Sequence, residues 1–310
     1  MRTPILCYHK VGEPHERFLN VSVRDFRRQV AFLARRYRLI PLRDLYAAEG
    51  RCVVLTFDDA YVCSTEPLLQ AAKDHDATGT VFPVTAFVGD MSRWDGENAR
   101  QLADWDSLTR LRDAGYEIGN HTHTHADLSA PIPSVCGSER TAGERPAPGP
   151  VMLSPSKHDV ADRLARADSR ERAATESMLR QAQHDETGCR HDMSGAQRET
   201  ARSAAEEMGF DEPRDGESGI WAEIAAAEEE LVRCIGVRPK TFAYPFGRYG
   251  EVAVRAVRAR GYLAAVTVRF GIAGDRHDPH ILPRILISYS DGLAGLLYKL
   301  YIRPLLQGRR

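Results

Sequence analysis

Two short polar motifs about sixty residues apart carry the side chains that could do chemistry in this chain. Asp58 and Asp59 end an apolar run, and His121-Thr122-His123-Thr124-His125 follows a second strand-like stretch. One carboxylate and two imidazoles can bind a divalent metal ion and still leave coordination positions open, as in catalytic zinc sites. A water molecule bound there becomes acidic, and the remaining carboxylate could take its proton. The motifs therefore predict metal-assisted hydrolysis, provided that the fold brings them together.

The residues next to the motifs predict how these side chains are directed. The run Val53–Phe57 is typical of a buried strand, and consecutive residues at its end would point to opposite sides. One of Asp58 and Asp59 could then bind metal while the other acts as a base. His121 and His125 are four residues apart, so a helical turn would place both rings on one face. Two simpler interpretations remain open: the Asp pair could cap a turn or helix, and the His run could be a polar loop.

At these residues the sequence resembles the polysaccharide deacetylases, also called the NodB-homology family or carbohydrate esterase family four. The family's Thr-Phe-Asp-Asp-Gly motif matches residues 56–60, with Ala60 in place of glycine. Its His-Ser/Thr-x-x-His motif matches residues 121–125 in full. The resemblance implies Asp58 as the general base and, as ligands of a divalent metal ion, Asp59, His121 and His125. Zn²⁺ is the expected ion, with Co²⁺ or a similar ion as an alternative.

The third motif is altered in this chain. Residues 242–247, Phe-Ala-Tyr-Pro-Phe-Gly, resemble the form found in one subgroup of the family, and the main-chain amide of Phe246 is expected to stabilise the oxyanion. In the wider family this motif carries an arginine that orients the base, but Ala243 stands at its position. Arg238 and Arg248 are the candidates to replace it.

The last motif, Leu-x-His, would supply the acid that protonates the leaving amine, but here it reads Leu282-Pro283-Arg284. Arg284 cannot donate a proton at neutral pH, although it could hold a carboxylate such as Asp58. His277 and His280 are close in sequence but not at the motif position. His9, in a segment that resembles the subgroup's first strand, is expected either near the metal end of the barrel or as a core residue.

The alternation of strand and helix patterns over residues 1–130 and 220–310 predicts an α/β fold with a parallel sheet closed into a barrel. The resemblance implies an irregular (β/α)7-type barrel with the metal site at the carboxyl ends of the strands. Helices are expected at 22–37, 65–72, 105–114, 221–234 and 250–260, and strands at 39–40, 53–57, 79–84, 116–119, 241–244, 262–268 and 281–287.

Residues 131–219 do not fit this alternation. They are rich in Pro, Gly and Ser at first and then in charged residues and Ala, a low-complexity composition that predicts an insertion without a core of its own. Residues 151–158 and 178–184 resemble peptides encoded by short repetitive elements in bacterial genomes. We expect this insertion to be disordered and to have no catalytic role, the alternative being a substrate lid or partner-binding arm.

Composition and charge restrict the partners and the cellular location that we expect for this chain. The net charge of −1 over 310 residues argues against a nucleic-acid partner. The six cysteines have no metal-ligand spacing and fit a reducing compartment, and no signal peptide is visible. These features predict a cytoplasmic or peripheral membrane location. The apolar and basic tail, 292–310, could lie on a membrane surface, although a terminal helix packed on the barrel is the favoured interpretation. Pro304 would interrupt either helix.

The resemblance implies a metal-dependent hydrolase that removes N-acetyl groups from an acetylated sugar or polysaccharide. Trp94, Trp105 and Tyr244 are candidates for stacking against a sugar, with packing in the core as the alternative. Two other functions remain open. One is an amidohydrolase acting on a small non-sugar amide or imide. The other is a catalytically degenerate member that binds metal or carbohydrate, suggested by Ala60, Ala243 and Arg284.

Overall fold

The structure is a computed structural model, and it describes residues 2–13, 19–130, 132 and 217–307. The chain divides into two compact units, and the described residues 93–99, which include η3 (Arg93–Asn98), belong to the second. All other described residues belong to the first unit. Most of the predicted insertion, residues 131–219, lies outside the described residues. Helix α7 (Ser218–Ile235) begins at Ser218, within the last two residues of this segment.

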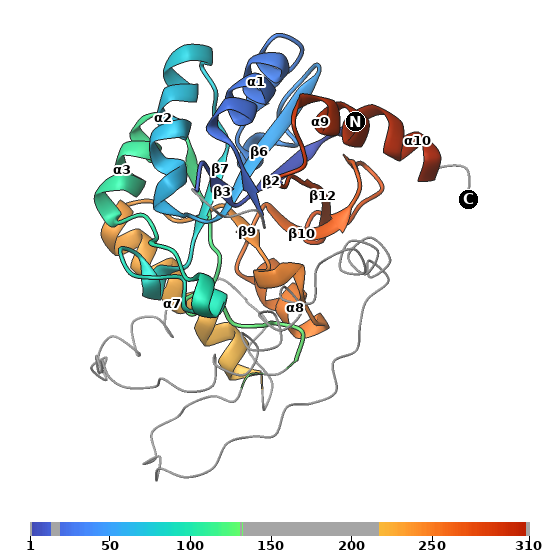
Figure 1. The fold of residues 1–310 in the computed structure, drawn as a ribbon. Coiled ribbons are helices and arrows are strands. Elements are labelled where there is room, and N and C mark those ends of the chain that lie inside the picture. The colour runs from blue at the N-terminus through green and yellow to red at the C-terminus, as the bar shows by residue number, and fades with distance from the viewer. Residues whose placement is uncertain (1, 14–18, 131, 133–216, 308–310) are drawn as a thin grey trace, which may run out of the picture. The chain divides into compact units, whose positions relative to one another are not determined.

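A parallel sheet forms the centre of the first unit and curls into a barrel (Figure 1). The strands follow the order β8-β7-β6-β2-β12-β10-β9, and β5 (Arg38–Ile40) pairs with the start of β6. A parallel bridge between Asn120 and Phe242 joins the two ends of this order. The strands are β2 (Ile5–Tyr8), β6 (Cys52–Asp59), β7 (Thr80–Pro83), β8 (Glu117–Ile118), β9 (Thr241–Ala243), β10 (Ala264–Phe270) and β12 (Leu282–Leu286). The predicted α/β barrel is thus confirmed.

Helices cover the outside of the sheet, as the alternating pattern predicts (Figure 1). Ser22 caps the first of them, and its Oγ accepts a hydrogen bond from the Asp25 amide at 3.0 Å. The helices are α1 (Val23–Ala34), α2 (Val62–His75), α3 (Trp105–Asp113), α7 and α8 (Glu251–Ala259). Smaller elements are β1 (Arg2–Thr3), β3 (Lys10–Val11), β4 (Asn20–Val21), η1 (Leu42–Asp44), η2 (Thr85–Phe87), η4 (Pro245–Gly247) and β11 (Ala273–Gly274).

The C-terminal tail is helical and passes through Pro304. It consists of α9 (Leu293–Leu297), the π-helical turn η5 (Tyr298–Ile302) and α10 (Arg303–Gln307). The prediction that Pro304 interrupts the helix is wrong, because helical structure continues from η5 into α10, with a wider π-helical turn just before this proline. Among the described residues, no helix is both long and apolar enough to span a bilayer.

Strand β6 positions the acidic pair. Every residue from Cys52 to Asp59 is buried, since β2 lies on one side of the strand and β5 and β7 on the other. Its apolar side chains pack into the core, where the Phe57 ring stacks on that of Tyr8 with centroids 5.3 Å apart. Asp58 and Asp59 lie opposite Phe82 and Pro83 at the end of β7. Both carboxylates therefore emerge at the carboxyl end of the barrel strands.

Candidate metal centre and active site

Asp59, His121 and His125 form a buried cluster at this end of the barrel. One ligand atom from each lies within 4.8 Å of the others. Nε2 of His121 is 3.4 Å and Nε2 of His125 is 3.3 Å from Asp59 Oδ1. This oxygen is buried and accepts no hydrogen bond from any described residue. A buried carboxylate oxygen without a donor is costly unless a cation satisfies it, so these three residues fit a divalent metal ion.

The two histidines meet through a loop and not through a helix. The prediction of a helical turn is wrong, because residues 121–125 follow β8 without helical structure. Thr122 and His125 have left-handed backbones, with φ values of 67° and 61°. These values bend the chain back on itself, so that the rings of His121 and His125 lie 5.0 Å apart. Left-handed φ is unfavourable for a β-branched residue such as Thr122, and such strain is typical of functional sites.

A carbonyl group fixes the ring of His121. Its Nδ1 lies 2.8 Å from the main-chain oxygen of Ala243, which can only accept a hydrogen bond. Nδ1 therefore carries a proton, which leaves Nε2, the nitrogen that faces Asp59, as the atom that can bind a metal ion. Ala243 thus has a structural role through its backbone, although its side chain replaces the family arginine.

Glu223 holds the histidine loop in place, and sequence reasoning missed this residue. Its carboxylate accepts hydrogen bonds from the amides of His123 and Thr124 at 3.2 and 2.9 Å, and from Thr124 Oγ1 at 2.8 Å. Glu223 lies on α7, nearly a hundred residues further along the chain. No local motif in the sequence signals such a contact.

We predict that Glu223→Gln weakens metal binding by about 10- to 100-fold, because an amide group cannot accept all three hydrogen bonds and the loop carries two metal ligands. Competition with a chromophoric chelator measures this affinity. Glu229→Gln on the exposed side of α7 is the matched control. Equal affinity in the Glu223→Gln variant and the wild type would show that the loop does not depend on this carboxylate.

The environment of Asp59 and His125 favours the forms that bind metal, whereas that of His121 favours the protonated ring while no ion is bound. Burial alone would raise the pKa of Asp59, but the imidazoles of His121 and His125 hold it well below the usual range. Burial lowers the pKa of His125 and so favours the neutral ring. Burial also opposes the charged form of His121, but the neighbouring Asp59 and Asp58 outweigh it and raise that pKa. A cation in the site would take over the role of the proton between Asp59 and His121.

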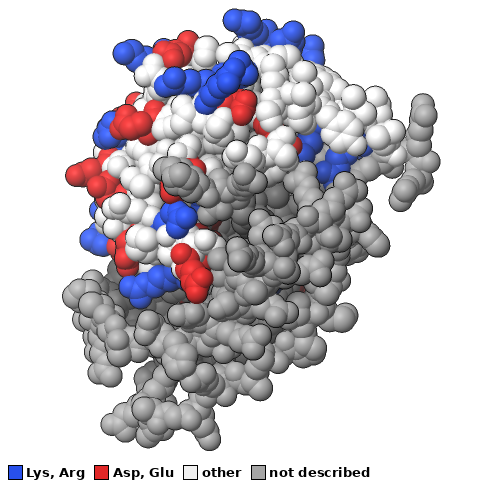
Figure 2. Space-filling view, in the orientation of Figure 1, with Lys and Arg blue, Asp and Glu red and all other residues white. Residues whose placement is uncertain are grey.

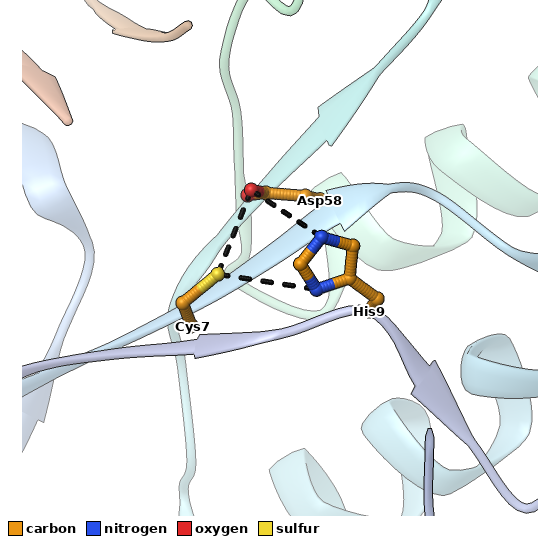
Figure 3. A group of neighbouring side chains, drawn as sticks. All are labelled: Cys7, His9 and Asp58. Atoms are coloured by element: carbon orange, nitrogen blue, oxygen red, sulfur yellow. Dashed lines mark hydrogen bonds and ion pairs between the residues drawn. The ribbon is translucent and has the colours of Figure 1, made fainter. Parts of the chain in front are cut away.

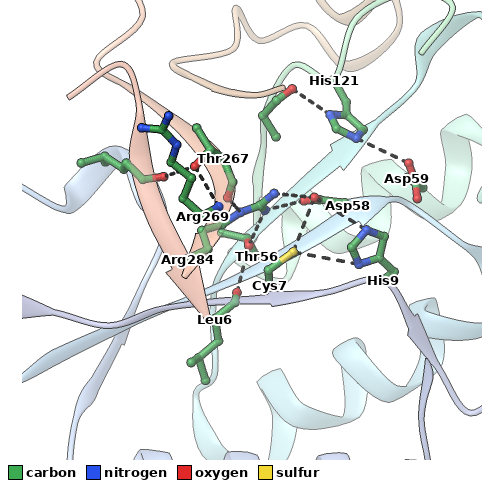
Figure 4. Close-up of polar contacts among 12 residues, drawn as sticks. Leu6, Cys7, His9, Thr56, Asp58, Asp59, His121, Thr267, Arg269 and Arg284 are labelled. Carbon is green, nitrogen blue, oxygen red and sulfur yellow. Dashed lines mark hydrogen bonds and ion pairs between the residues drawn. The ribbon is translucent and has the colours of Figure 1, made fainter. Parts of the chain in front are cut away.

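Asp58 points away from Asp59 and makes a two-pronged ion pair with Arg284 (Figure 4). Arg284 Nη1 lies 2.7 Å from Oδ1 and Nη2 lies 2.6 Å from Oδ2. Arg284 is completely buried, and its Nε and Nη1 also donate to Thr267 O and Thr56 Oγ1. Burial would raise the pKa of Asp58, but the charge and hydrogen bonds of Arg284 outweigh it and lower the pKa to about 2. Asp58 is therefore ionised and held in one orientation.

Arg284, and not Arg238 or Arg248, lies beside Asp58 and orients this carboxylate. Arg238 pairs with Glu228, and Arg248 pairs with Asp127 at the surface, so the prediction that one of them replaces the family arginine is wrong. Arg284 reaches Asp58 because β12 pairs with β2, which in turn pairs with β6. The expectation that Arg284 could hold Asp58 is confirmed by this contact.

His9 and Cys7 lie on the other side of Asp58 (Figure 3). His9 Nε2 is 3.9 Å and Cys7 Sγ is 3.6 Å from the same oxygen, Oδ2. Burial lowers the pKa of His9, although the two carboxylates partly oppose this. His9 therefore lies at the metal end of the barrel, which is one of the two positions expected from the sequence. His280 instead bonds Tyr262 O, and His277 bonds Gly274 O, in the segment that precedes β12.

Phe246 lies beside the metal cluster. Its ring centroid is 4.5 Å from that of His125, its side chain is 47% exposed, and its φ is 57°. The next residue, Gly247, has φ of 66°, and a Cβ there would lie 2.3 Å from a methyl group of Val268. Glycine is thus required at this position, and the turn presents Phe246 to the site.

Two of the three residues predicted to stack against a sugar pack in the core, whereas Phe246 is exposed at the site. Tyr244 is fully buried, with its hydroxyl bonded to His280 O at 2.9 Å, and Trp105 packs against the core from α3. Core packing is therefore the correct interpretation of both. Trp94 lies in η3 of the second unit. Phe246 is the aromatic side chain that the described structure exposes at the site.

Comparisons with known proteins agree with this geometry. Residues 46–185 match the family model described as polysaccharide deacetylase, which confirms the family inferred from the two motifs. The matched segment, which contains both motifs, is thus similar to the polysaccharide deacetylases, hydrolases that act on C–N bonds.

Solved structures show the same fold. The deacetylase PplD from Streptococcus pyogenes, solved with acetate, has 16% identity and a TM-score of 0.58, over 96% of this chain and 98% of that one. A de-N-acetylase from Aggregatibacter actinomycetemcomitans has 16% identity and a TM-score of 0.58, over 96% and 100%. IcaB from Ammonifex degensii has 18% identity and a TM-score of 0.55, over 95% of each chain.

Proposed function

We propose that this chain is a metal-dependent hydrolase that removes N-acetyl groups from an acetylated sugar or polysaccharide. One observation carries the proposal: the buried cluster of Asp59, His121 and His125 lies directly beside an ionised carboxylate, Asp58, held by Arg284. A metal-binding cluster next to an oriented base is what hydrolysis of an unactivated amide requires. Zn²⁺ fits the two nitrogen and one oxygen ligands, and Co²⁺ is the alternative.

Each residue then has a distinct role. When bound, the ion supplies Lewis acidity toward the acetyl carbonyl and lowers the pKa of a water molecule. Asp58 takes a proton from the attacking water, and Arg284 keeps this carboxylate ionised and oriented. The main-chain amide of Phe246 donates to the oxyanion that develops on the acetyl oxygen. The exposed ring of Phe246 offers an apolar surface beside His125 on which a sugar could stack.

His9 is the proposed acid that protonates the leaving amine, a role that the last family motif does not fill here. Its Nε2 lies 3.9 Å from Asp58 Oδ2, which is too long for a hydrogen bond, so a proton taken by Asp58 would reach His9 and then the amine through a bridging water molecule. His277 bonds Gly274 O and His280 bonds Tyr262 O, and no described contact joins either imidazole to Asp58. His9 is thus the described imidazole outside the metal cluster that faces the base.

We predict that His9→Gln lowers kcat for an N-acetyl amide by about 10²-fold but spares hydrolysis of an activated acetyl ester, whose leaving group needs no proton. The two substrates are compared at one pH with metal bound. Equal losses on both would indicate that His9 supports the structure of the site and is not the acid.

The degenerate alternative loses its main support. The altered third and last motifs suggested it, yet the arginine lost at Ala243 is supplied by Arg284. Ala60 adopts φ of 58°, so the alanine occupies the left-handed conformation that the family's glycine favours. A small non-sugar amide remains a possible substrate that no contact in the structure favours. The C-terminal tail is not part of this site, and a membrane contact through it remains a proposal, as does a cytoplasmic location.

Acetate release from oligomers of N-acetylglucosamine, with and without a chelator, tests the proposed function. We expect release that stops when the metal is removed and returns when it is restored. Release from small amides but not from the oligomers would favour the amidohydrolase. Metal binding without any release would favour the degenerate member.

A further inference from the structure

Helix α1 presents only arginine to solvent. Its exposed residues, including the two that follow its last residue, are Arg24, Arg27, Arg28, Arg35 and Arg36. The single acid of the helix, Asp25, is half-buried and accepts a hydrogen bond from Ser22 Oγ at 2.7 Å. Within the described part of the chain, none of the five arginines forms an ion pair with a carboxylate. Five uncompensated guanidinium groups on one short helix are an anion-binding surface.

A groove runs between α1 and α9 beside these arginines. It has a volume of about 330 Å³ and is lined by Arg28, Ala31, Phe32, Arg35, Arg36 and Leu293. The Arg36 guanidinium lies over the Phe32 ring, 4.1 Å from its centroid. The groove therefore has an apolar floor with cationic groups at its edge. An acyl chain with an anionic headgroup has this chemistry.

The C-terminal helix continues the surface with an apolar face. Its exposed large side chains are Tyr298 (45%), Tyr301 (38%), Ile302 (50%), Leu305 (70%) and Leu306 (56%). Spacings of three and four residues place them on one side of the helix, while Leu296 and Leu300 are buried against the barrel. The hydroxyl of Tyr301 lies 2.9 Å from that of Tyr37 just after α1, which joins this face to the arginine helix.

The space-filling view shows the basic surface of α1 next to the apolar face of the C-terminal helix. In Figure 2, Lys and Arg gather at the upper edge, where Figure 1 places α1, and an uncharged area lies over the C-terminal helices. Residues 293–307 contain Lys299 and Arg303 but no acid. A group of neighbouring exposed apolar side chains beside cationic groups is typical of an interaction surface.

We propose that α1 and the helix of residues 293–307 form one surface that docks on a membrane containing anionic phospholipid. The arginines of α1 pair with lipid phosphates, and the aromatic and leucine side chains enter the boundary between headgroups and acyl chains. A second copy of the chain is a poor occupant, because a two-fold interface over this surface would bring two sets of these arginines into one contact area. This proposal does not depend on the proposed enzymatic function.

Co-sedimentation of the full chain with vesicles tests the proposal. We expect binding to vesicles of phosphatidylcholine mixed with phosphatidylglycerol, little binding to phosphatidylcholine alone, and weakening as salt is raised. Arg28→Glu/Arg35→Glu should reduce the affinity at least about tenfold, since each basic group near the surface contributes about a factor of five or more. Leu305→Ser/Leu306→Ser should also weaken binding, but without removing the preference for anionic lipid.

The matched control reverses the same number of charges on the other side of the barrel. Arg110→Glu/Arg233→Glu changes two exposed arginines, on α3 and α7, and should bind like the wild type. Acetate release from a soluble oligomer and circular dichroism check that each variant is folded. Equal binding to neutral and anionic vesicles, or equal losses in the control, would overturn the proposal. So would a dimer in sedimentation equilibrium that Leu305→Ser/Leu306→Ser converts to a monomer.

Discussion

Replacing Asp58 by Asn is expected to lower kcat/KM for N-acetyl hydrolysis by about 10³-fold while the metal stays bound. The amide of Asn cannot take a proton from water, and the three metal ligands are on other residues. Asp58 Oδ1 and Oδ2 are engaged by Arg284, and Asp58 is not one of the three residues of the metal cluster. Metal content and acetate release are measured on the same preparation.

The Asp58→Asn variant should also lose stability, and this loss can be separated from the loss of catalysis. Without the Asp58 carboxylate, the buried guanidinium of Arg284 loses its counterion, which costs on the order of 3–5 kcal/mol of stability. The double variant Asp58→Asn/Arg284→Met removes that unpaired charge and should recover much of the stability but none of the activity. An Asp58→Asn variant that binds metal and retains activity within about tenfold of the wild type would show that another group is the base.

Arg284→Met is expected to lower the free energy of unfolding by about 3–5 kcal/mol at neutral pH, because it leaves the Asp58 carboxylate buried without a cation. Chemical denaturation measures this loss. Arg248→Met is the control, since Arg248 forms an ion pair with Asp127 at the surface and should cost less than about 1 kcal/mol. A loss in Arg284→Met no larger than in this control would show that the buried pair does not support the fold.

The loss should depend on pH in a defined direction. The pKa of Asp58 in the fold, about 2, is below its ordinary value, so the pair with Arg284 stabilises the wild type above about pH 4. That contribution is lost as the pH falls towards 2. The stability difference between wild type and Arg284→Met should therefore be largest at neutral pH and narrow in acid. In the variant the pKa of Asp58 rises, and the acidic limb of the activity profile should move to higher pH.

The sequence made the barrel and the position of the acidic pair predictable, because both depend on local patterns. The apolar run before Asp58 specifies a buried strand, and helical spacing of apolar residues placed α1, α3, α7 and α8 close to their observed bounds. Strand geometry predicted that Asp58 and Asp59 point away from each other, although the backbone of Asp59 is left-handed, with φ of 66°. These features need only neighbouring residues to form.

The rest of the site depends on contacts between distant segments and on backbone torsions. The left-handed Thr122 and His125 have no sequence signal that distinguishes them from a helical turn. Glu223 acts on a loop nearly a hundred residues away, and Arg284 reaches Asp58 only because of the strand order. The family pattern placed the orienting arginine at Ala243, whereas here a neighbouring strand supplies it. Motif matching alone therefore made the site look less complete than it is.

The most direct test of the proposed metal-dependent deacetylation is acetate release from N-acetylglucosamine oligomers as Zn²⁺ is added to metal-free protein. We expect activity to rise in proportion to added metal and to level off at one ion per chain, held by Asp59, His121 and His125. The His125→Ala variant should show neither tight binding nor activity under the same conditions. Full activity in the metal-free protein, or equal activity in the His125→Ala variant and the wild type, would contradict the proposed mechanism.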